Sequence, residues 1–138
     1  MTDVGVAPIR GLVPMIYAAD VERSVAFFRH LGFEVGHSVP SGNERKEWAW
    51  LYAPGVPDWK RGPNLMVTRR SGAGGGDGHG VLLYLYATDL TGLRSQLMAD
   101  GLNPSEISYP DYLPGGEMKV FDPDGHTLMI AQSATDTP

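Results

Sequence analysis

The 138-residue chain contains no cysteine, so disulfides, thiol catalysis and cysteine metal sites are excluded. Long hydrophobic runs are also missing: the longest apolar stretches, such as Val81 to Tyr86, are far too short to span a bilayer. Basic residues are not in excess, because 16 Asp and Glu outnumber 11 Lys and Arg and give a net charge of −5. Nucleic acid is therefore a poor partner, since phosphate binding needs a basic surface. We expect a globular protein with no nucleic-acid or membrane partner, located in the cytoplasm.

What the chain does contain is an internal repeat. Tyr17-Ala18-Ala19-Asp20 precedes a helix-like pattern that stops at Gly32, and Tyr86-Ala87-Thr88-Asp89 precedes another that stops at Gly101. The spacing from Tyr to Asp and from Asp to Gly is the same in both copies. The two aspartates lie 69 residues apart, which is half of the chain. A repeat of this length indicates two copies of one supersecondary unit.

Each copy predicts a strand, a helix and three more strands. Asp20 and Asp89 are expected as helix N-caps, and Gly32 and Gly101 as helix stops. The expected strands are 11–18, 33–39, 47–53 and 64–68 in the first module, and 81–87, 107–109, 117–121 and 127–131 in the second. The modules occupy 9–70 and 81–132, with a glycine-rich linker at 71–80 inside one compact domain. The expected fold class is α+β, with two βαβββ modules forming a curved mixed sheet around a cavity and the helices outside.

The paired strand-Asp-helix-Gly units, and the closing strand with Asp122-Pro123-Asp124-Gly125-His126, resemble the vicinal oxygen chelate superfamily. This superfamily groups glyoxalases, extradiol dioxygenases, fosfomycin-resistance enzymes and metal-free bleomycin-resistance proteins. The resemblance covers roughly residues 9 to 132. It implies the two-module fold, and it implies a homodimer in which each hollow is completed by the partner chain.

The enzymes of this superfamily hold a divalent metal on His, Glu or Gln side chains from the first and fourth strands of each module. Alignment on the N-cap aspartates places the four corresponding positions at Val13, Met66, Leu82 and Met129. None is a ligand for the ions that this superfamily uses. We therefore expect no metal and no other cofactor at these positions. A metal-dependent glyoxalase- or dioxygenase-like enzyme with displaced ligands remains the alternative hypothesis.

Aromatic residues alternate along two expected strands, so that Trp48, Trp50 and Tyr52 share one face. Plain aliphatics already supply a face for helix packing, which favours the hollow for the aromatics; the alternative is that they are ordinary core. Such rings suit a flat or cationic ligand. Glu47, Asp111 and Glu117 are acidic candidates at the rim. The full candidate ligand-binding set is Tyr17, His37, Trp48, Trp50, Tyr52, Trp59, Tyr84, Tyr86, Asp111, Tyr112 and Met118.

The residues favour a binding protein over an enzyme. The leading hypothesis is a metal-free drug- or natural-product-binding protein, similar to the bleomycin-resistance type, which protects by sequestration, as in antibiotic resistance. A regulatory domain with a vestigial pocket is a further possibility. The small-molecule partner is expected to be planar or cationic.

Overall fold

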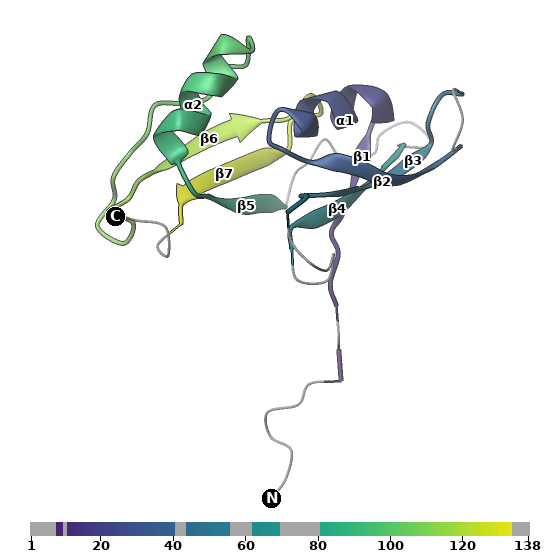
Figure 1. The fold of residues 1–138 in the computed structure, drawn as a ribbon, viewed down its shortest axis with the longest axis horizontal. Helices are drawn as coiled ribbons and strands as arrows, with labels where there is room; N and C mark the ends of the chain where they lie inside the picture. The colour runs from purple at the N-terminus through teal and green to yellow at the C-terminus, as the bar shows by residue number, and fades with distance from the viewer. Residues whose placement is uncertain (1–7, 10, 41–43, 56–61, 70–80, 134–138) are drawn as a thin grey trace, which may run out of the picture.

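The computed structural model describes residues 8–9, 11–40, 44–55, 62–69 and 81–133, in two sheets that each carry one helix on the same side (Figure 1). The first sheet has the order β1-β4-β3-β2 and the second has the order β5-β7-β6. The strands are β1 (Met15–Ala18), β2 (Glu34–Val39), β3 (Trp48–Tyr52), β4 (Asn64–Arg69), β5 (Leu82–Ala87), β6 (Glu117–Phe121) and β7 (Thr127–Gln132), and the helices are α1 (Val21–Arg29) and α2 (Leu90–Ala99).

Both sheets are mixed in the same way. The first strand of each module lies parallel to the last, as in β1 with β4 and β5 with β7, and the other pairs are antiparallel. This repeated connectivity confirms the α+β fold of two related modules. Among the described residues, no helix is long and apolar enough to cross a membrane.

The helix ends follow the repeat in the sequence. The Asp20 carboxylate accepts from the backbone N–H of Arg23 at 3.1 Å, and the Asp89 carboxylate accepts from that of Gly92 at 3.0 Å. Gly32 and Gly101 have φ values of +93° and +88°, which a residue with a Cβ adopts only with strain. The local signals therefore predicted both helices correctly.

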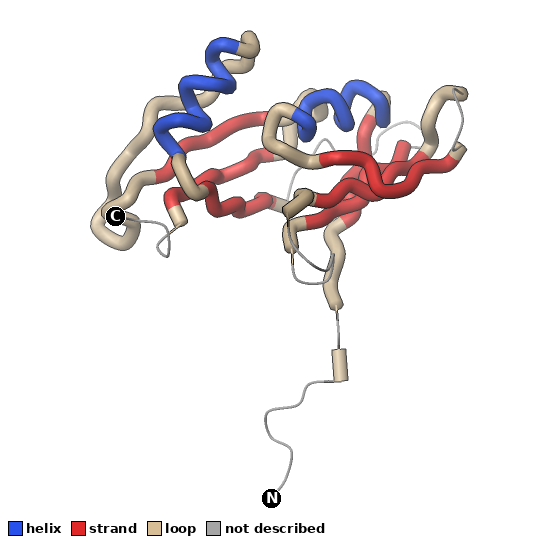
Figure 2. Tube along the Cα trace, in the orientation of Figure 1, coloured by secondary structure: helices blue, strands red, loops and turns tan. Residues whose placement is uncertain are grey.

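The core lies between the helices and the sheets, as the layers in Figure 2 show. Alternate residues of the central strands, such as Leu51, Val67, Leu128 and Ile130, are almost fully buried on this side. The residues between them point to the other side of the sheet, because strand side chains alternate. Among the described residues, no layer covers the side of each sheet that faces away from the helices.

The predicted strand at 107–109 is wrong in extent, because only one bridge, between Ser108 and Glu117, forms there. Pro104 and Pro110 flank this segment and have no N–H with which to extend a ladder. At the start of the chain, β1 begins at Met15 rather than at Gly11. The glycine-rich linker and Trp59 lie outside the described residues.

The two sheets do not close into a barrel within the described part of the chain. Contacts between loops and helix ends hold the modules together instead. The backbone N–H of Ala19 donates to Asp124 at 2.9 Å, and His30 and Asp100, at the ends of the two helices, lie 3.1 Å apart. The described residues therefore do not enclose the expected hollow, and the sheet surface that they leave uncovered is accessible to a ligand.

Candidate functional site

The candidate site is the uncovered side of the two sheets, which we call the open face. It consists of Met15, Tyr17, Trp48, Trp50, Tyr52 and Met66 in the first module and Leu82, Tyr84, Tyr86, Lys119 and Met129 in the second. The strand register supports this grouping, because Met66 lies between Met15 and Trp50. The same register places Met129 beside Tyr84. Tyr17 and Tyr86 are 55% and 67% exposed, so these large side chains are not ordinary core.

In the first module the open face carries an aromatic platform of Trp48, Trp50 and Tyr52. The rings of Trp50 and Tyr52 are stacked, with centroids 5.3 Å apart and an interplanar angle of 18°. The indole N–H of Trp50 donates to the side-chain oxygen of Asn64 at 3.1 Å, which fixes the orientation of that ring. His37 lies edge-on to Trp48 at 5.7 Å. The platform is therefore a pre-oriented stacking surface.

Gly36 makes this orientation possible. A Cβ at this position would clash with the Trp50 ring and would come within 3.2 Å of the Tyr52 ring. The strand register also shifts between Val35 and His37, beside this glycine. The indole therefore lies directly against the backbone of β2. This close approach depends on the absence of a side chain at residue 36.

In the second module the open face carries a cluster of tyrosines around one carboxylate. The Tyr84 hydroxyl donates to Glu117 Oε1 at 2.5 Å, and the Tyr112 hydroxyl donates to Glu117 Oε2 at 3.3 Å. The Tyr86 ring lies 5.5 Å from that of Tyr84. The hydrogen bond to Glu117, with burial and the carboxylate's charge, raises the pKa of Tyr84 to about 12. The Glu117 charge, followed by burial and the hydrogen bond, raises the pKa of Tyr112. We call Tyr84, Tyr86, Tyr112 and Glu117 the tyrosine–carboxylate cluster.

The four positions aligned with the superfamily's metal ligands carry no suitable donors. Met66 and Met129 lie at matching places in β4 and β7, and Leu82 lies opposite Thr127 on the edge of the second sheet. Thioether sulfur is a poor ligand for hard or borderline cations. In addition, no group of three or more His, Cys, Asp or Glu among the described residues is placed to hold a metal. The donor set therefore does not fit the metal that the superfamily's enzymes use.

Two other candidate residues lie elsewhere. Met118 is 1% exposed and packs in the core on the helix side, because its neighbours Glu117 and Lys119 point to the other side. Asp111 is exposed in the loop between α2 and β6, next to Tyr112. We therefore keep Asp111 in the proposed ligand-binding set and leave Met118 out of it.

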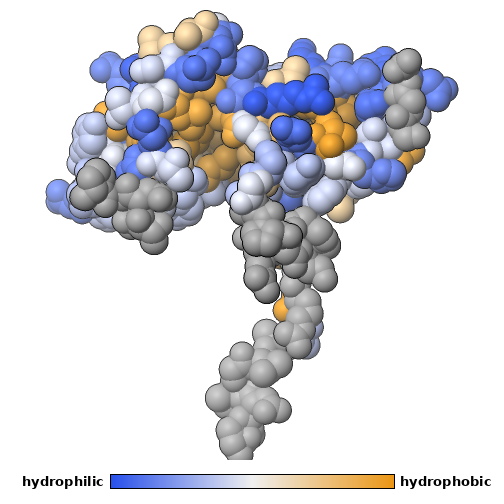
Figure 3. Space-filling view, in the orientation of Figure 1, coloured by the Kyte–Doolittle hydropathy of each residue, from blue (hydrophilic) through white to orange (hydrophobic). Residues whose placement is uncertain are grey.

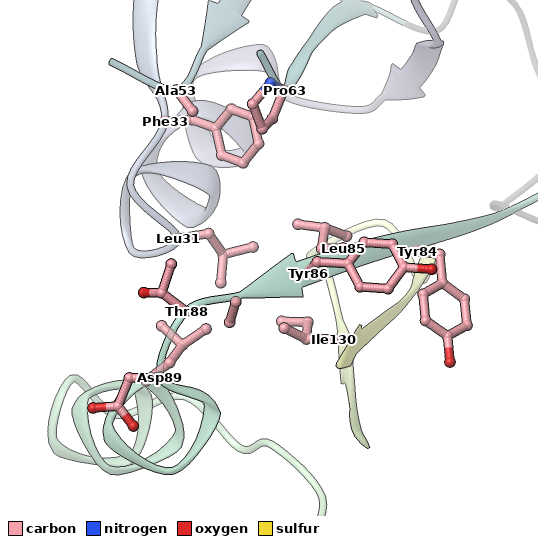
Figure 4. Close-up of a pocket in the computed structure, with 12 residues that line it drawn as sticks. Leu31, Phe33, Ala53, Pro63, Tyr84, Leu85, Tyr86, Thr88, Asp89 and Ile130 are labelled. Atoms are coloured by element: carbon pink, nitrogen blue, oxygen red, sulfur yellow. The ribbon is translucent and has the colours of Figure 1, made fainter. Parts of the chain in front are cut away.

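A cavity of about 600 Å³ lies where the two modules meet. Leu31, Phe33, Ala53 and Pro63 line one side, and β5 with Leu93 and Ile130 lines the other (Figure 4). Figure 3 shows the apolar surface exposed around this junction. The sequence analysis did not select Phe33, Pro63 or Leu85 as site residues. No local pattern marks them, because they meet only when the modules pack.

A family model described as the Glyoxalase/Bleomycin resistance protein/Dioxygenase superfamily matches residues 12–130. The chain belongs to this superfamily. Its similarity to individual proteins is more distant, and a comparison with curated protein sequences found no significant match.

Several solved structures share the fold. A bleomycin-binding protein complexed with bleomycin is 18% identical, with a TM-score of 0.65 over 88% of this chain and 97% of that one. TnmS3, an antibiotic binding protein from Streptomyces sp. CB03234, is 16% identical, with a TM-score of 0.69 over 94% and 98%. Lactoylglutathione lyase from Agrobacterium tumefaciens is 15% identical, with a TM-score of 0.65 over 92% and 96%. Because binding proteins and an enzyme share this fold, function has to be argued from the site.

Proposed function

We propose that this protein binds a planar, cationic small molecule on the open face and acts by sequestration rather than by metal-dependent catalysis. One observation carries the proposal: the positions that the sequence repeat aligns with the superfamily's metal ligands are apolar, and aromatic residues lie beside Met66 and Met129 on the open face. Two of the similar structures are a bleomycin-binding protein and an antibiotic binding protein, which supports a small molecule as the ligand.

The expected affinity can be bounded from the surface that a ligand would bury. Burial of about 300 Å² of apolar ligand surface contributes about 7 kcal/mol at about 25 cal/mol per Å². Immobilising the ligand costs several kcal/mol of this gain. Micromolar binding requires about 8 kcal/mol net. Stacking on Trp50 and Tyr52 and a contact with a charged group would have to supply the difference.

We further propose that two copies of the chain close the site. The open face is too exposed to surround a ligand by itself. In the described part of the chain, β1 and β5 are edge strands with an unpaired side. Ile9 and Leu12, on the segment that runs away from β1 in Figure 1, are 73% and 90% exposed. A second copy would cover these apolar and unpaired surfaces.

The proposal is tested by titrating planar cationic compounds, glycopeptide antibiotics and acridines among them, while monitoring tryptophan fluorescence. At least one compound should bind with micromolar affinity. Binding no tighter than millimolar across the panel would contradict the proposal. Elemental analysis of the purified protein should find no stoichiometric divalent metal, whereas one ion per site would favour the metal-dependent enzyme.

Light scattering tests the assembly. At micromolar concentration the mass should be that of two chains. A mass of 14.9 kDa, the value for one chain, would contradict the homodimer while leaving ligand binding on the open face intact.

A further inference from the structure

The tyrosine–carboxylate cluster has an unusual balance of hydrogen-bond donors and acceptors. Glu117, at the start of β6, is only 8% exposed, and the hydroxyls of Tyr84 and Tyr112 each donate to one of its two oxygens. Among the described residues, no Lys, Arg or His forms a salt bridge with Glu117. The cluster therefore holds a carboxylate that is hydrogen-bonded but forms no salt bridge with a cationic side chain of the described residues.

The hydroxyl protons of Tyr84 and Tyr112 are both used in the hydrogen bonds to Glu117. A tyrosine hydroxyl has one donor, and here that donor is directed to Glu117. The raised pKa of Tyr84, about 12, keeps this phenol neutral and in its donating form at physiological pH. What remains for a ligand is a set of lone pairs on the phenol oxygens and the carboxylate. The oxygens of Tyr84, Tyr112 and Glu117 thus offer acceptors to a ligand, while the hydroxyls of Tyr84 and Tyr112 have no proton left to donate.

The rings strengthen the preference for positive charge. Tyr84 and Tyr86 lie side by side on the open face, with centroids 5.5 Å apart, and Tyr86 is largely exposed. The face of an aromatic ring attracts a cation, and the effect grows as the cation loses water. An anion would be repelled by the Glu117 carboxylate and would find no proton to accept from the hydroxyls of Tyr84 and Tyr112.

A metal ion is a poorer match than an organic cation. Hard divalent cations prefer several carboxylate or carbonyl oxygen ligands, whereas this cluster offers one carboxylate and neutral phenols. An N–H group attached to a positive charge matches both the acceptor geometry and the rings.

We propose that Tyr84, Tyr86, Tyr112 and Glu117 bind a cationic N–H donor of the ligand, an ammonium or guanidinium group. This assignment rests on the proposed function and specifies which part of the ligand the second module recognises. Tyr112 reaches the site from the loop between α2 and β6, so that loop contributes to recognition.

The experiment compares three acridines that differ only at the end of a propyl side chain: a guanidinium, a trimethylammonium and a neutral acetamide. Calorimetry on the full chain should show the guanidinium compound binding about ten-fold more tightly than the acetamide. The trimethylammonium compound, which has the charge without N–H donors, should lie between them. Equal affinity of all three would overturn the assignment of the cluster. If none binds, it is the proposed function of acridine-like ligand binding that fails.

Glu117→Gln is the decisive variant, because it keeps the shape of the side chain and removes the charge. It should abolish the advantage of the guanidinium compound and leave the acetamide affinity within about two-fold of wild type. Glu106→Gln, which removes an exposed charge from the same module, is the matched control and should retain the full advantage. Equal weakening of all three compounds in Glu117→Gln would mean that Glu117 only supports the loop, and would overturn the proposal.

A measurement on the wild-type protein covers the case in which Glu117→Gln does not fold. The guanidinium remains charged at high pH, so its binding beside Glu117 should lower the pKa of Tyr84 from about 12 in an ultraviolet titration of the phenols. The acetamide should leave that pKa unchanged. If the pKa of Tyr84 did not change when the guanidinium compound saturated the protein, the cation would not bind beside Glu117, and the proposal would be overturned.

Discussion

The two modules share a fold but present different chemistry on the open face. The first offers stacked Trp50 and Tyr52 rings, and the Trp50 indole N–H donates to the side-chain oxygen of Asn64. The second offers tyrosines whose hydroxyls converge on the buried carboxylate of Glu117. The backbones repeat, since β1 with β4 and β5 with β7 are both parallel pairs. The comparison teaches that the repeated unit sets positions, while side chains on the uncovered side set what each half recognises.

The same comparison separates stability from function within each sheet. On the helix side both modules bury aliphatic residues at equivalent places, such as Leu65 and Leu128. On the open face Met66 and Met129 match, but Met15 in the first module corresponds to Tyr84 in the second. Substitutions on the helix side should therefore have matching effects in the two halves, and substitutions on the open face should not.

The largest expected effect comes from the shared helix side. Leu65→Ala and Leu128→Ala should each lower the free energy of unfolding by about 2–5 kcal/mol, because each leaves a cavity in a close-packed core. Chemical denaturation monitored by circular dichroism measures both. A large loss in one module with almost none in the other would show that the two halves are not equivalent in stability.

A smaller effect is expected on the platform of the first module. Trp50→Ala should weaken binding of the acridine acetamide about ten-fold, because it removes the stacking surface. Gly36→Ala should also weaken binding, since the added Cβ displaces the Trp50 ring. Calorimetry provides the measurement, with thermal unfolding as the check that each variant is folded. If Trp50→Ala bound the acetamide compound as tightly as wild type, the planar part of the ligand would not stack on the first module.

The raised pKa of Tyr84 in the second module makes the stability of the fold depend on pH in the alkaline range. The folded-state pKa of Tyr84, about 12, lies above the ordinary tyrosine pKa of about 10, so its contribution to stability is complete below about pH 10 and is lost as the pH rises toward 12. In Glu117→Gln the last phenol to titrate should do so nearer to pH 10. Ultraviolet titration of native protein checks this. A Tyr84→Phe protein that still shows a phenol titrating near 12 would contradict the assignment.

The smallest effect is expected at the contact between the helix ends. His30 and Asp100 lie 3.1 Å apart but are partly exposed. His30→Ala should therefore change the free energy of unfolding by only about 0.2–1 kcal/mol. Denaturant titration measures it. A loss of several kcal/mol would mean that this link holds the modules together more than their apolar contact does.

The sequence predicted what depends on local signals. Asp20 and Asp89 mark helix starts because a carboxylate caps free N–H groups within three residues, and the two-residue period of Trp48 and Trp50 revealed their common face. The same period excludes Met118 from the face that carries Glu117, so both could not belong to one site. The prediction of a strand at 107–109 was wrong because Pro104 and Pro110, on either side of the segment, limit its pairing to a single bridge.

Other features required the tertiary structure. Tyr84 and Glu117 are separated by 33 residues and meet across β7 only because of the strand register. The cavity between the modules combines Phe33 and Pro63 with β5, which no local pattern relates. The expected hollow likewise proved to be uncovered, because a sequence pattern defines the face of a sheet but not what covers it.

The central claim is that this chain binds a planar cation without a metal. The most direct measurement is calorimetric titration of the protein with the guanidinium acridine before and after exhaustive treatment with a chelator. The account predicts micromolar affinity that is the same in both titrations. Loss of binding on chelation, restored by a divalent metal, would contradict it.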